Sequence, residues 1–314
     1  MTHLKARTVA ALIALVATPA ASWAQGTMSP DERRNMDLVN EWGRLVIEAA
    51  QVAEADKYMA PDYIQHNPMI ETGRDAFVKD FGRRPPREPR AEMTPAPVVE
   101  FAKGPYALWV FEREAKDQNG VVYKFNSFDL FRLENGKVAE HWGGRPAFRP
   151  ALVPGQPAPD AVVQGVGPKP IKPGNSPAEQ QNEDIANQLF RNILQYGHVE
   201  LAQQVMAPGY VQHNPNVATG RRAFVEFFGK TRTPEPLRTE WKDEPELTIT
   251  SGNIVLYMFK RFSVDPSNPS QVYKWNWFDM VRVDGGLVRE HWDSAVKISP
   301  PATVPMPAGF GEYR

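Results

Sequence analysis

The sequence predicts an α+β fold built twice, each time as a curved antiparallel sheet wrapped around helices. Three observations predict it: two blocks of sequence recur, each copy opens with helix-start signals, and each copy ends in aromatic and β-branched strands joined by tight turns. A chain of 314 residues, 42% of them hydrophobic, is long and apolar enough for two packed cores.

The repeat is visible in two aligned blocks. Tyr58–Gly82 and Val205–Gly229 are identical at 16 of 25 positions, where composition alone predicts about one or two. Tyr123–Trp142 and Tyr273–Trp292 are identical at 11 of 20 positions. The offset between copies grows from 147 to 150 residues, so the loops between the blocks differ slightly in length.

Each copy begins with a predicted helix. The segments SPDE at Ser29 and SPAE at Ser176 have the form of a capping box with proline at the first helical position. Apolar residues then recur at helical spacing from Leu38 and from Ile185. Later helices are expected to end near Met59 and Met206 and to span Ala76–Phe81 and Ala223–Phe228, with Gly82 and Gly229 as C-terminal caps.

Strands follow the helices. YIQH and YVQH form short predicted strands, each closed by Asn-Pro, and long strands are expected over Tyr106–Arg113 and Val121–Leu133. Asn135-Gly136 and Gly285-Gly286 predict type I′ hairpin turns, each leading into a last strand that ends at EHW. A sheet that curves around helices in this way leaves room for a cavity between them.

The ends of the chain and the segment between the copies are predicted to lie outside the two folded units. Lys5 and Arg7, the apolar run Val9–Ala17 and the small residues before Gln25 predict a signal peptide cleaved after Ala24, and therefore a periplasmic or secreted protein. The expected organisation is a signal peptide at 1–24, a first domain at 28–144, a proline-rich linker at 145–175, a second domain at 176–298 and a proline-rich tail at 299–314.

The net charge and the absence of cysteine exclude several classes of function. The net charge of −1, without a basic stripe, argues against nucleic-acid or membrane partners and leaves a small-molecule substrate. The absence of cysteine excludes thiol catalysis and cysteine metal sites. We expect either a monomer whose two units form an internal pseudo-dimer or a homo-oligomer, with Trp275 and Trp277, which replace Phe125 and Ser127, at the contact between sheets.

The motifs YIQHNP, TGRxAF and FDxFRxxxGKxxEHW resemble those of SnoaL-like proteins, in the nuclear transport factor 2-like superfamily. The resemblance spans roughly 28–144 and 175–297 and implies cone-shaped α+β barrels. It also implies cofactor-free chemistry, since relatives include polyketide cyclases, isomerases, dehydratases and lyases, although other members only bind ligands. In the cyclases a pocket Asp acts as general acid/base with a His. The similar position here is Asp293, which is Gly143 in the first unit, so the resemblance places catalysis in the second unit.

The repeated His, Asp and Tyr residues suit general acid/base work on a small, largely apolar substrate that is aromatic or bears a carbonyl. Retro-aldol cleavage, dehydration, cyclisation and isomerisation all fit this chemistry. The candidate catalytic residues are Asp293, His291, His213, Asp279, Tyr210, His66, His141, Asp129 and Tyr63. The candidate substrate-binding residues are Trp275, Trp277, Phe278, Trp292, Arg282, Phe128, Trp142, Lys124 and Lys274.

Strand pairing decides which of these side chains share a face. A two-residue turn without a bulge places Asp279 opposite Trp292, so that Asp279 and His291 lie on opposite faces of the sheet. A bulge would shift this register by one residue. The resemblance favours the face of His291 and Asp293 as the cavity wall.

The sequence leaves several alternatives to this interpretation open. Two His and one Asp per unit could hold a metal, as His66, Asp129 and His141 or as His213, Asp279 and His291. The protein could also bind a ligand without catalysis. The EHW tryptophans could be core residues, the strand aspartates could pair with Arg132 and Arg282, and the histidines before Asn-Pro could bond only to turn backbone.

Overall fold

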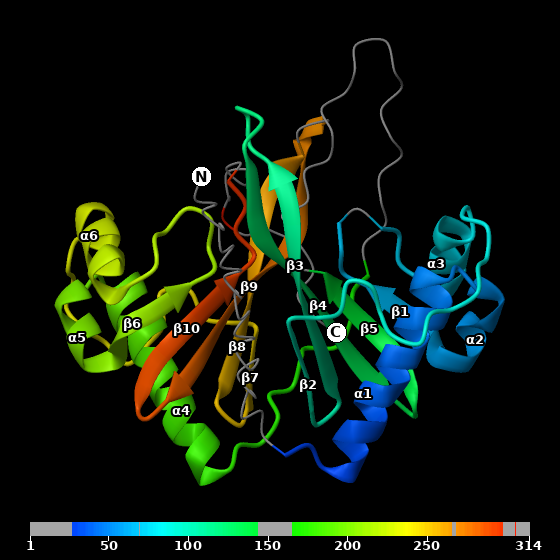
Figure 1. Ribbon diagram of the computed structural model, residues 1–314, viewed down its shortest axis with the longest axis horizontal. Helices are drawn as coiled ribbons and strands as arrows, with labels where there is room; N and C mark the ends of the chain where they lie inside the picture. The colour runs from blue at the N-terminus through cyan, green and yellow to red at the C-terminus, as the bar shows by residue number, and fades with distance from the viewer. Residues whose placement is uncertain (1–26, 69, 144–164, 266–267, 298–304, 306–314) are drawn as a thin grey trace, which may run out of the picture.

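The computed structural model describes residues 27–68, 70–143, 165–265, 268–297 and 305. Within them the chain forms two α+β units with the same order of elements (Figure 1). The predicted signal peptide, most of the predicted linker and nearly all of the predicted tail lie outside the described residues. No helix in the described part of the chain is long and apolar enough to cross a membrane.

The first helix of each unit starts as predicted. In α1 (Pro30–Trp42) the Ser29 hydroxyl accepts the Glu32 N–H at 3.3 Å and the Glu32 carboxylate accepts the Ser29 N–H at 2.8 Å, which completes a capping box. The same box opens α4 (Pro177–Asn187). The remaining helical segments are η1 (Gly43–Glu48), η2 (Val52–Glu54), α2 (Ala55–Tyr58), α3 (Arg74–Phe81), η3 (Gln188–Gln195), η4 (Val199–Leu201), α5 (Ala202–Val205) and α6 (Arg221–Thr231).

One of the two predicted glycine caps is wrong. Gly82 does follow the last residue of α3, although its φ of −70° is right-handed. Gly229 lies inside α6, which continues to Thr231 and ends at Arg232. A glycine weakens a helix but does not stop it when the following residues can still form helical hydrogen bonds.

Each unit holds one five-stranded sheet. The strands are β1 (Met59–Gln65), β2 (Val99–Lys103), β3 (Tyr106–Lys116), β4 (Val122–Glu134), β5 (Lys137–Gly143), β6 (Met206–Gln212), β7 (Leu247–Ser251), β8 (Ile254–Asp265), β9 (Asn268–Asp284) and β10 (Leu287–Asp293). Their order is β1-β5-β4-β3-β2 in the first unit and β6-β10-β9-β8-β7 in the second. Because β1 and β6 pair in parallel with β5 and β10, the sheets are mixed rather than purely antiparallel. The two edge strands of each sheet do not pair with each other, so each cone is open rather than a closed barrel.

A bulge follows each predicted hairpin turn. Asn135 and Gly136 both have positive φ, 52° and 70°, as a type I′ turn requires. Leu133 then pairs with Val138 and Arg132 with Glu140, which leaves Ala139 as an extra residue in β5.

The second unit has the same bulge, with Arg289 as the extra residue of β10. The register expected without a bulge is therefore wrong by one residue. Asp279 pairs with Asp293, and His291 pairs with Val281. Because directly opposed residues of an antiparallel pair share a face, Asp279, His291 and Asp293 all lie on one face of the sheet.

The two sheets pack against each other with the helices on the outer sides (Figure 1). One apolar cluster contains residues from both sheets, including Trp142 and Trp292. At its centre the rings of Phe128 and Phe278 stack with centroids 5.4 Å apart and planes inclined by 3°. The expected contact through Trp275 and Trp277 is wrong, because Phe278 points into the contact and its odd-numbered neighbours point to the opposite face.

We predict that Phe278→Ala lowers the free energy of unfolding by about 3–5 kcal/mol. The change leaves a cavity between the two sheets, and neither sheet can move alone to fill it. Urea unfolding followed by tryptophan fluorescence measures this loss. Val122→Ala is the control: Val122 is 55% exposed, so its replacement should change the free energy of unfolding little. A loss below about 1 kcal/mol for Phe278→Ala would show that the sheet contact contributes little to stability.

Candidate active site

In the first unit the strand register brings a chain of polar side chains together on the face toward the helices. Nε2 of His141 (β5) lies 3.0 Å from Oδ1 of Asp129 (β4), and Nδ1 of His141 lies 3.1 Å from Oε1 of Gln65 (β1). The Gln65 amide nitrogen donates to the Tyr63 hydroxyl at 3.0 Å. Three neighbouring strands thus align Asp129, His141, Gln65 and Tyr63 in one row.

The backbone determines where the protons of this row lie. The N–H of Asn67 donates to Oε1 of Gln65 at 3.0 Å, so this atom is the oxygen of the amide. Nδ1 of His141 must therefore carry a proton and donate it. Nε2 then faces Asp129 across 3.0 Å, and the pair holds one further proton, on the imidazole or on the carboxyl group. His141 and Asp129 form a dyad that shares a single proton.

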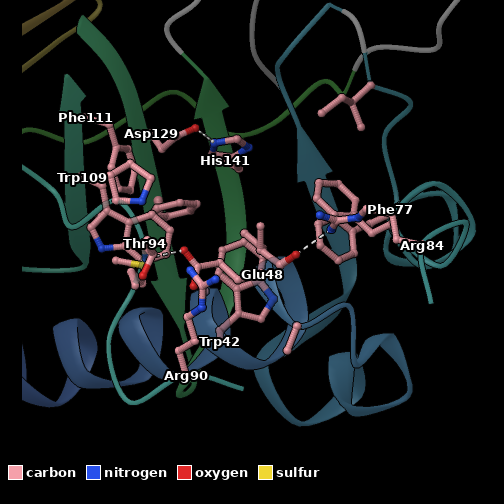
Figure 2. A pocket seen from close by; sticks show the side chains of 18 of the residues that line it. Trp42, Glu48, Phe77, Arg84, Arg90, Thr94, Trp109, Phe111, Asp129 and His141 are labelled. Carbon is pink, nitrogen blue, oxygen red and sulfur yellow. Dashed lines mark hydrogen bonds and ion pairs between the residues drawn. The ribbon is translucent and has the colours of Figure 1, made fainter. Parts of the chain in front are cut away.

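The dyad faces a cavity of about 680 Å³ between the sheet and the helices (Figure 2). This volume lies in the range of small-molecule sites. Asp129, His141 and Gln65 are among the polar residues that line it. The Asp129 side chain is 28% exposed, so one of its oxygens is accessible from the cavity. The aromatic side chains in the lining are Trp42, Phe77, Phe81, Trp109, Phe111 and Phe131.

Charged side chains from the segment after α3 lie at the rim of this cavity. Arg84, Arg87 and Arg90 are exposed and line it, and Figure 2 shows Arg84 and Arg90 on separate sides. Arg113 of β3 also lines it, with its guanidinium 4.4 Å from the centre of the Phe111 ring. The rim also carries Glu48, whose carboxylate accepts the Thr94 N–H at 2.8 Å.

The second unit repeats the row and adds one carboxylate. His291 lies 3.0 Å from Asp279 and 2.9 Å from Gln212. Asp293 faces Asp279 across the strand pair and accepts hydrogen bonds from Asn214 at 2.6 Å and from the Ala295 N–H at 2.9 Å. In the first unit the position of Asp293 is Gly143, so Asp129 has no opposing carboxylate.

The added carboxylate changes the protonation of the second row. Burial raises the pKa of Asp293 to about 6, aided by the charge of Asp279 and opposed by His291 and by the two hydrogen bonds. Burial by itself would lower the pKa of His291, but the hydrogen bond to Asp279 and the charges of Asp293 and Asp279 raise it overall. Asp293 therefore exchanges its proton near pH 6, and His291 holds its proton more tightly than an ordinary histidine.

Larger side chains occupy the second unit at positions that line the cavity of the first. The Phe190 ring lies 5.8 Å from the His291 ring and 4.7 Å from the Tyr257 ring, and Trp241 lies 5.8 Å from Tyr257. Tyr196 is buried and donates to the Glu240 carbonyl. At the aligned cavity-lining positions the first unit has smaller residues: Gly43 for Phe190, Met93 for Trp241 and Ala49 for Tyr196. A Cβ atom on Gly43 would lie 2.5 Å from the Trp109 ring, so the first unit requires glycine there.

The other predicted histidines lie on the opposite face of each sheet. His66 bonds Glu140 at 2.8 Å and stacks on Trp142 with centroids 4.7 Å apart, and Glu140 also bonds Arg132. His213 repeats this arrangement with Glu290, Trp292 and Arg282. The two metal triads that the sequence left as an alternative therefore do not form, because the sheet separates His66 and His213 from the Asp–His pairs.

A different set of possible ligands does converge in the second unit. Asp279, His291 and Asp293 each offer an atom within 4.8 Å of the others. Asn214, Gln212 and the Ala295 N–H already satisfy several of these atoms. The protein groups are thus hydrogen-bonded as they stand, and the geometry requires no ion.

The predicted substrate-binding residues fall into three locations. Phe128, Phe278, Trp142 and Trp292 belong to the core between the sheets, and Arg282 lies on the same face with Glu290. Lys124 is exposed beside Glu112, and Lys274 is mostly buried beside Glu246, where burial lowers its pKa. These residues do not line the cavity of the first unit. Trp275 and Trp277 lie toward the helices of the second unit, where Trp277 donates to Asp279 at 2.7 Å and Trp275 to Ser263 at 2.9 Å.

Sequence reasoning did not select Gln65 and Gln212, although they orient both histidines. The signal was present, because the glutamine is identical in the YIQHNP and YVQHNP motifs. Tyr63 and Tyr210, which the sequence predicts to be catalytic, are fully buried, and their hydroxyl groups accept hydrogen bonds from these glutamines. Burial raises the pKa of both tyrosines well above its ordinary value. In this geometry they position the glutamine.

Residues 39–141 match the family model described as the SnoaL-like domain. The first unit is a SnoaL-like domain. The second unit repeats its motifs, its order of elements and its strand pairing, and is a second copy of the same fold. No curated protein matches the chain.

Solved structures that resemble the chain cover little more than a third of it. A putative SnoaL-like polyketide cyclase from Jannaschia sp. CCS1 is 16% identical, with a TM-score of 0.27, over 38% of this chain and 88% of that one. An LEH-like epoxide hydrolase from M. tuberculosis is 13% identical, with a TM-score of 0.27, over 36% and 84%. An NTF2-like protein of unknown function from Mesorhizobium loti is 14% identical, with a TM-score of 0.27, over 37% and 94%.

We predict that Asp293→Asn gains stability relative to the wild type as the pH rises from 4 to 7. The folded pKa of about 6 lies above the ordinary value of 3.8, so the proton on Asp293 stabilises the fold at low pH and this contribution is lost as the pH rises through 6. The shift corresponds to a relative gain of about 3 kcal/mol. Urea unfolding at pH 4, 5, 6 and 7 measures it, and parallel stability curves for the two proteins would contradict the prediction.

Proposed function

We propose that the cavity of the first unit is the active site of a cofactor-independent general acid/base enzyme of lyase, isomerase or cyclase type. Asp129 is its proton-transferring group, and His141, oriented by Gln65, is the partner of Asp129. The substrate is small, largely apolar and aromatic, and it bears a carbonyl group. The observation that carries the proposal is a one-proton Asp–His dyad that opens into a cavity with aromatic walls.

The dyad suits reversible proton transfer. With its proton on His141, Asp129 is a carboxylate and takes a proton from a C–H bond next to the substrate carbonyl. The electron pair of that bond moves into an enolate, and Asp129 becomes a carboxylic acid beside the imidazolium of His141. Asp129 then returns its proton to a carbon or an oxygen of the intermediate, so no external acid or base is consumed. Return to another atom isomerises the substrate, and attack of the enolate carbon on a second carbonyl closes a ring.

The walls support this chemistry in two ways. Trp42, Trp109 and Phe131 supply apolar surface that holds a flat substrate against the dyad. They also exclude water, which strengthens the interaction between an enolate and a nearby imidazolium. The match to the SnoaL-like domain covers residues 39–141 of this unit and includes both residues of the dyad.

The second unit, in which the resemblance places catalysis, is a second candidate, because one observation favours it. Asp293 has a pKa of about 6 and lies beside a His–Asp pair, which suits an acid/base group at neutral pH. Against it, the Asp293 side chain is only 4% exposed, and Phe190, which takes the place of Gly43, lies against His291. We therefore rank the first unit ahead of the second.

Asp129→Asn should reduce catalysis by about 100- to 10,000-fold, because it removes the base without changing the shape of the side chain. Exchange of C–H for C–D next to the carbonyl of aryl β-keto compounds, followed by NMR in deuterium oxide, measures proton abstraction directly. The matched control is Asp279→Asn, the same change in the row that carries Phe190.

If Asp129→Asn loses the exchange activity while Asp279→Asn and Asp293→Asn retain it, the active site is in the first unit. If Asp293→Asn loses the exchange activity while Asp129→Asn retains it, the active site is in the second unit. Compounds that bind but do not exchange in any of these proteins would identify a ligand-binding protein without catalysis.

A further inference from the structure

We propose that the cavity of the first unit takes its substrate as an organic carboxylate, and that Arg84 and Arg87 bind the carboxylate group. The inference rests on the proposed function in that it takes this cavity as the substrate site, and it adds the chemical class of the substrate. It concerns residues that the acid/base chemistry does not use.

The two guanidinium groups are held at one edge of the cavity. Arg84 donates to the Ile47 carbonyl at 2.6 Å and Arg87 to the Glu48 carbonyl at 2.9 Å. These are consecutive carbonyls at the end of η1, where helical carbonyls lack intrahelical partners. Each of these bonds uses one of the five N–H donors of a guanidinium, so both groups are positioned and still have donors for a ligand.

The charges around the cavity favour an anion. Four arginines line it, whereas the acidic residues in the lining are Glu48, Glu88 and Asp129. Asp129 shares its proton with His141, so this pair carries no net charge in either of its two forms. Glu48 already accepts the Thr94 N–H. The rim is therefore positive overall, and a carboxylate there would form charge-assisted, bidentate hydrogen bonds with arginine.

The second unit lacks this pair of cations, because it has a carboxylate in the place of Arg87. The Arg87 N–H donates to the Ala49 carbonyl, and the Glu235 N–H donates to the carbonyl of Tyr196, the counterpart of Ala49, so Glu235 stands for Arg87. Arg232, which lies over the Phe228 ring as Arg84 lies over the Phe81 ring, is the counterpart of Arg84. The arginine pair thus occurs in the unit whose small residues leave a cavity, and is missing from the unit in which Phe190, Tyr196 and Trp241 are large. A role in the fold alone would apply to both copies, because both have the same helix in the same place.

The arrangement also orients the substrate. Arg84 and Asp129 lie at different ends of the site in Figure 2, with Phe77, Trp42 and Trp109 among the side chains around it. A carboxylate at the rim directs the rest of an aromatic molecule along the apolar walls toward the dyad. The substrate class that fits is an aryl carboxylic acid that carries its reactive C–H away from the carboxylate.

Binding of 2-naphthoate and of its neutral analogue 2-naphthamide, measured by quenching of tryptophan fluorescence in the full-length protein, tests the inference. The wild type should bind the carboxylate about tenfold more tightly than the amide, and Arg84→Gln and Arg87→Gln should each weaken carboxylate binding by about tenfold. Amide binding should stay unchanged, which shows that the cavity is intact. The matched control is Arg83→Gln, the same change in the same segment at an exposed arginine paired with Asp80.

Equal binding of carboxylate and amide by the wild type would overturn the inference. So would equal weakening of both probes in the arginine variants, or equal weakening of the carboxylate in Arg83→Gln. The same titration on Asp129→Asn separates this inference from the proposed function. If Asp129→Asn leaves exchange unchanged while the arginine variants still lose carboxylate affinity, the catalytic assignment fails and the anion site stands.

Discussion

The extra residue in the last strand of each unit is the constraint on which the rest of the structure depends. Ala139 and Arg289 form bulges that shift the pairing of the last strand by one residue. Without the shift, His141 would lie opposite Leu130, a core residue of the sheet contact, instead of Phe131 on the cavity side. With it, the histidine meets Asp129 on the side of the helices, and the neighbouring tryptophan meets the other sheet. One inserted residue therefore directs the Asp–His pair and the apolar contact to opposite faces.

The contact between the two sheets joins the two units through one apolar core. Each sheet has two buried faces, one under its own helices and one against the other sheet. The His–Glu–Arg groups lie on the second face, where Glu140 is fully buried and bonded by both His66 and Arg132. A buried carboxylate without such partners would be costly, so these histidines are explained by the fold.

The two copies differ in the size and the charge of the side chains around the Asp–His row. The first unit keeps small residues where the second has Phe190, Tyr196 and Trp241, and it has Gly143 where the second has Asp293. The first dyad therefore opens into a cavity, whereas the second row is packed by aromatic rings and holds two facing carboxylates. The same four-residue row is accessible from a cavity in the first unit, whereas in the second it is buried beside Asp293, whose pKa is about 6.

The sequence by itself determined the doubling, the capping boxes, the hairpin turns and the α+β class, because these depend on local chemistry and on comparison of one copy with the other. It also selected Asp129 and His141 as candidates. Only the tertiary structure decided that they meet, because a one-residue bulge has no reliable local signature and reverses which side chains share a face. The cavity, too, depends on volumes contributed by distant segments such as Gly43 and Met93. The parallel pairing of β1, the core position of Trp142 and Trp292, and the role of Gln65 likewise required knowing which strand lies beside which.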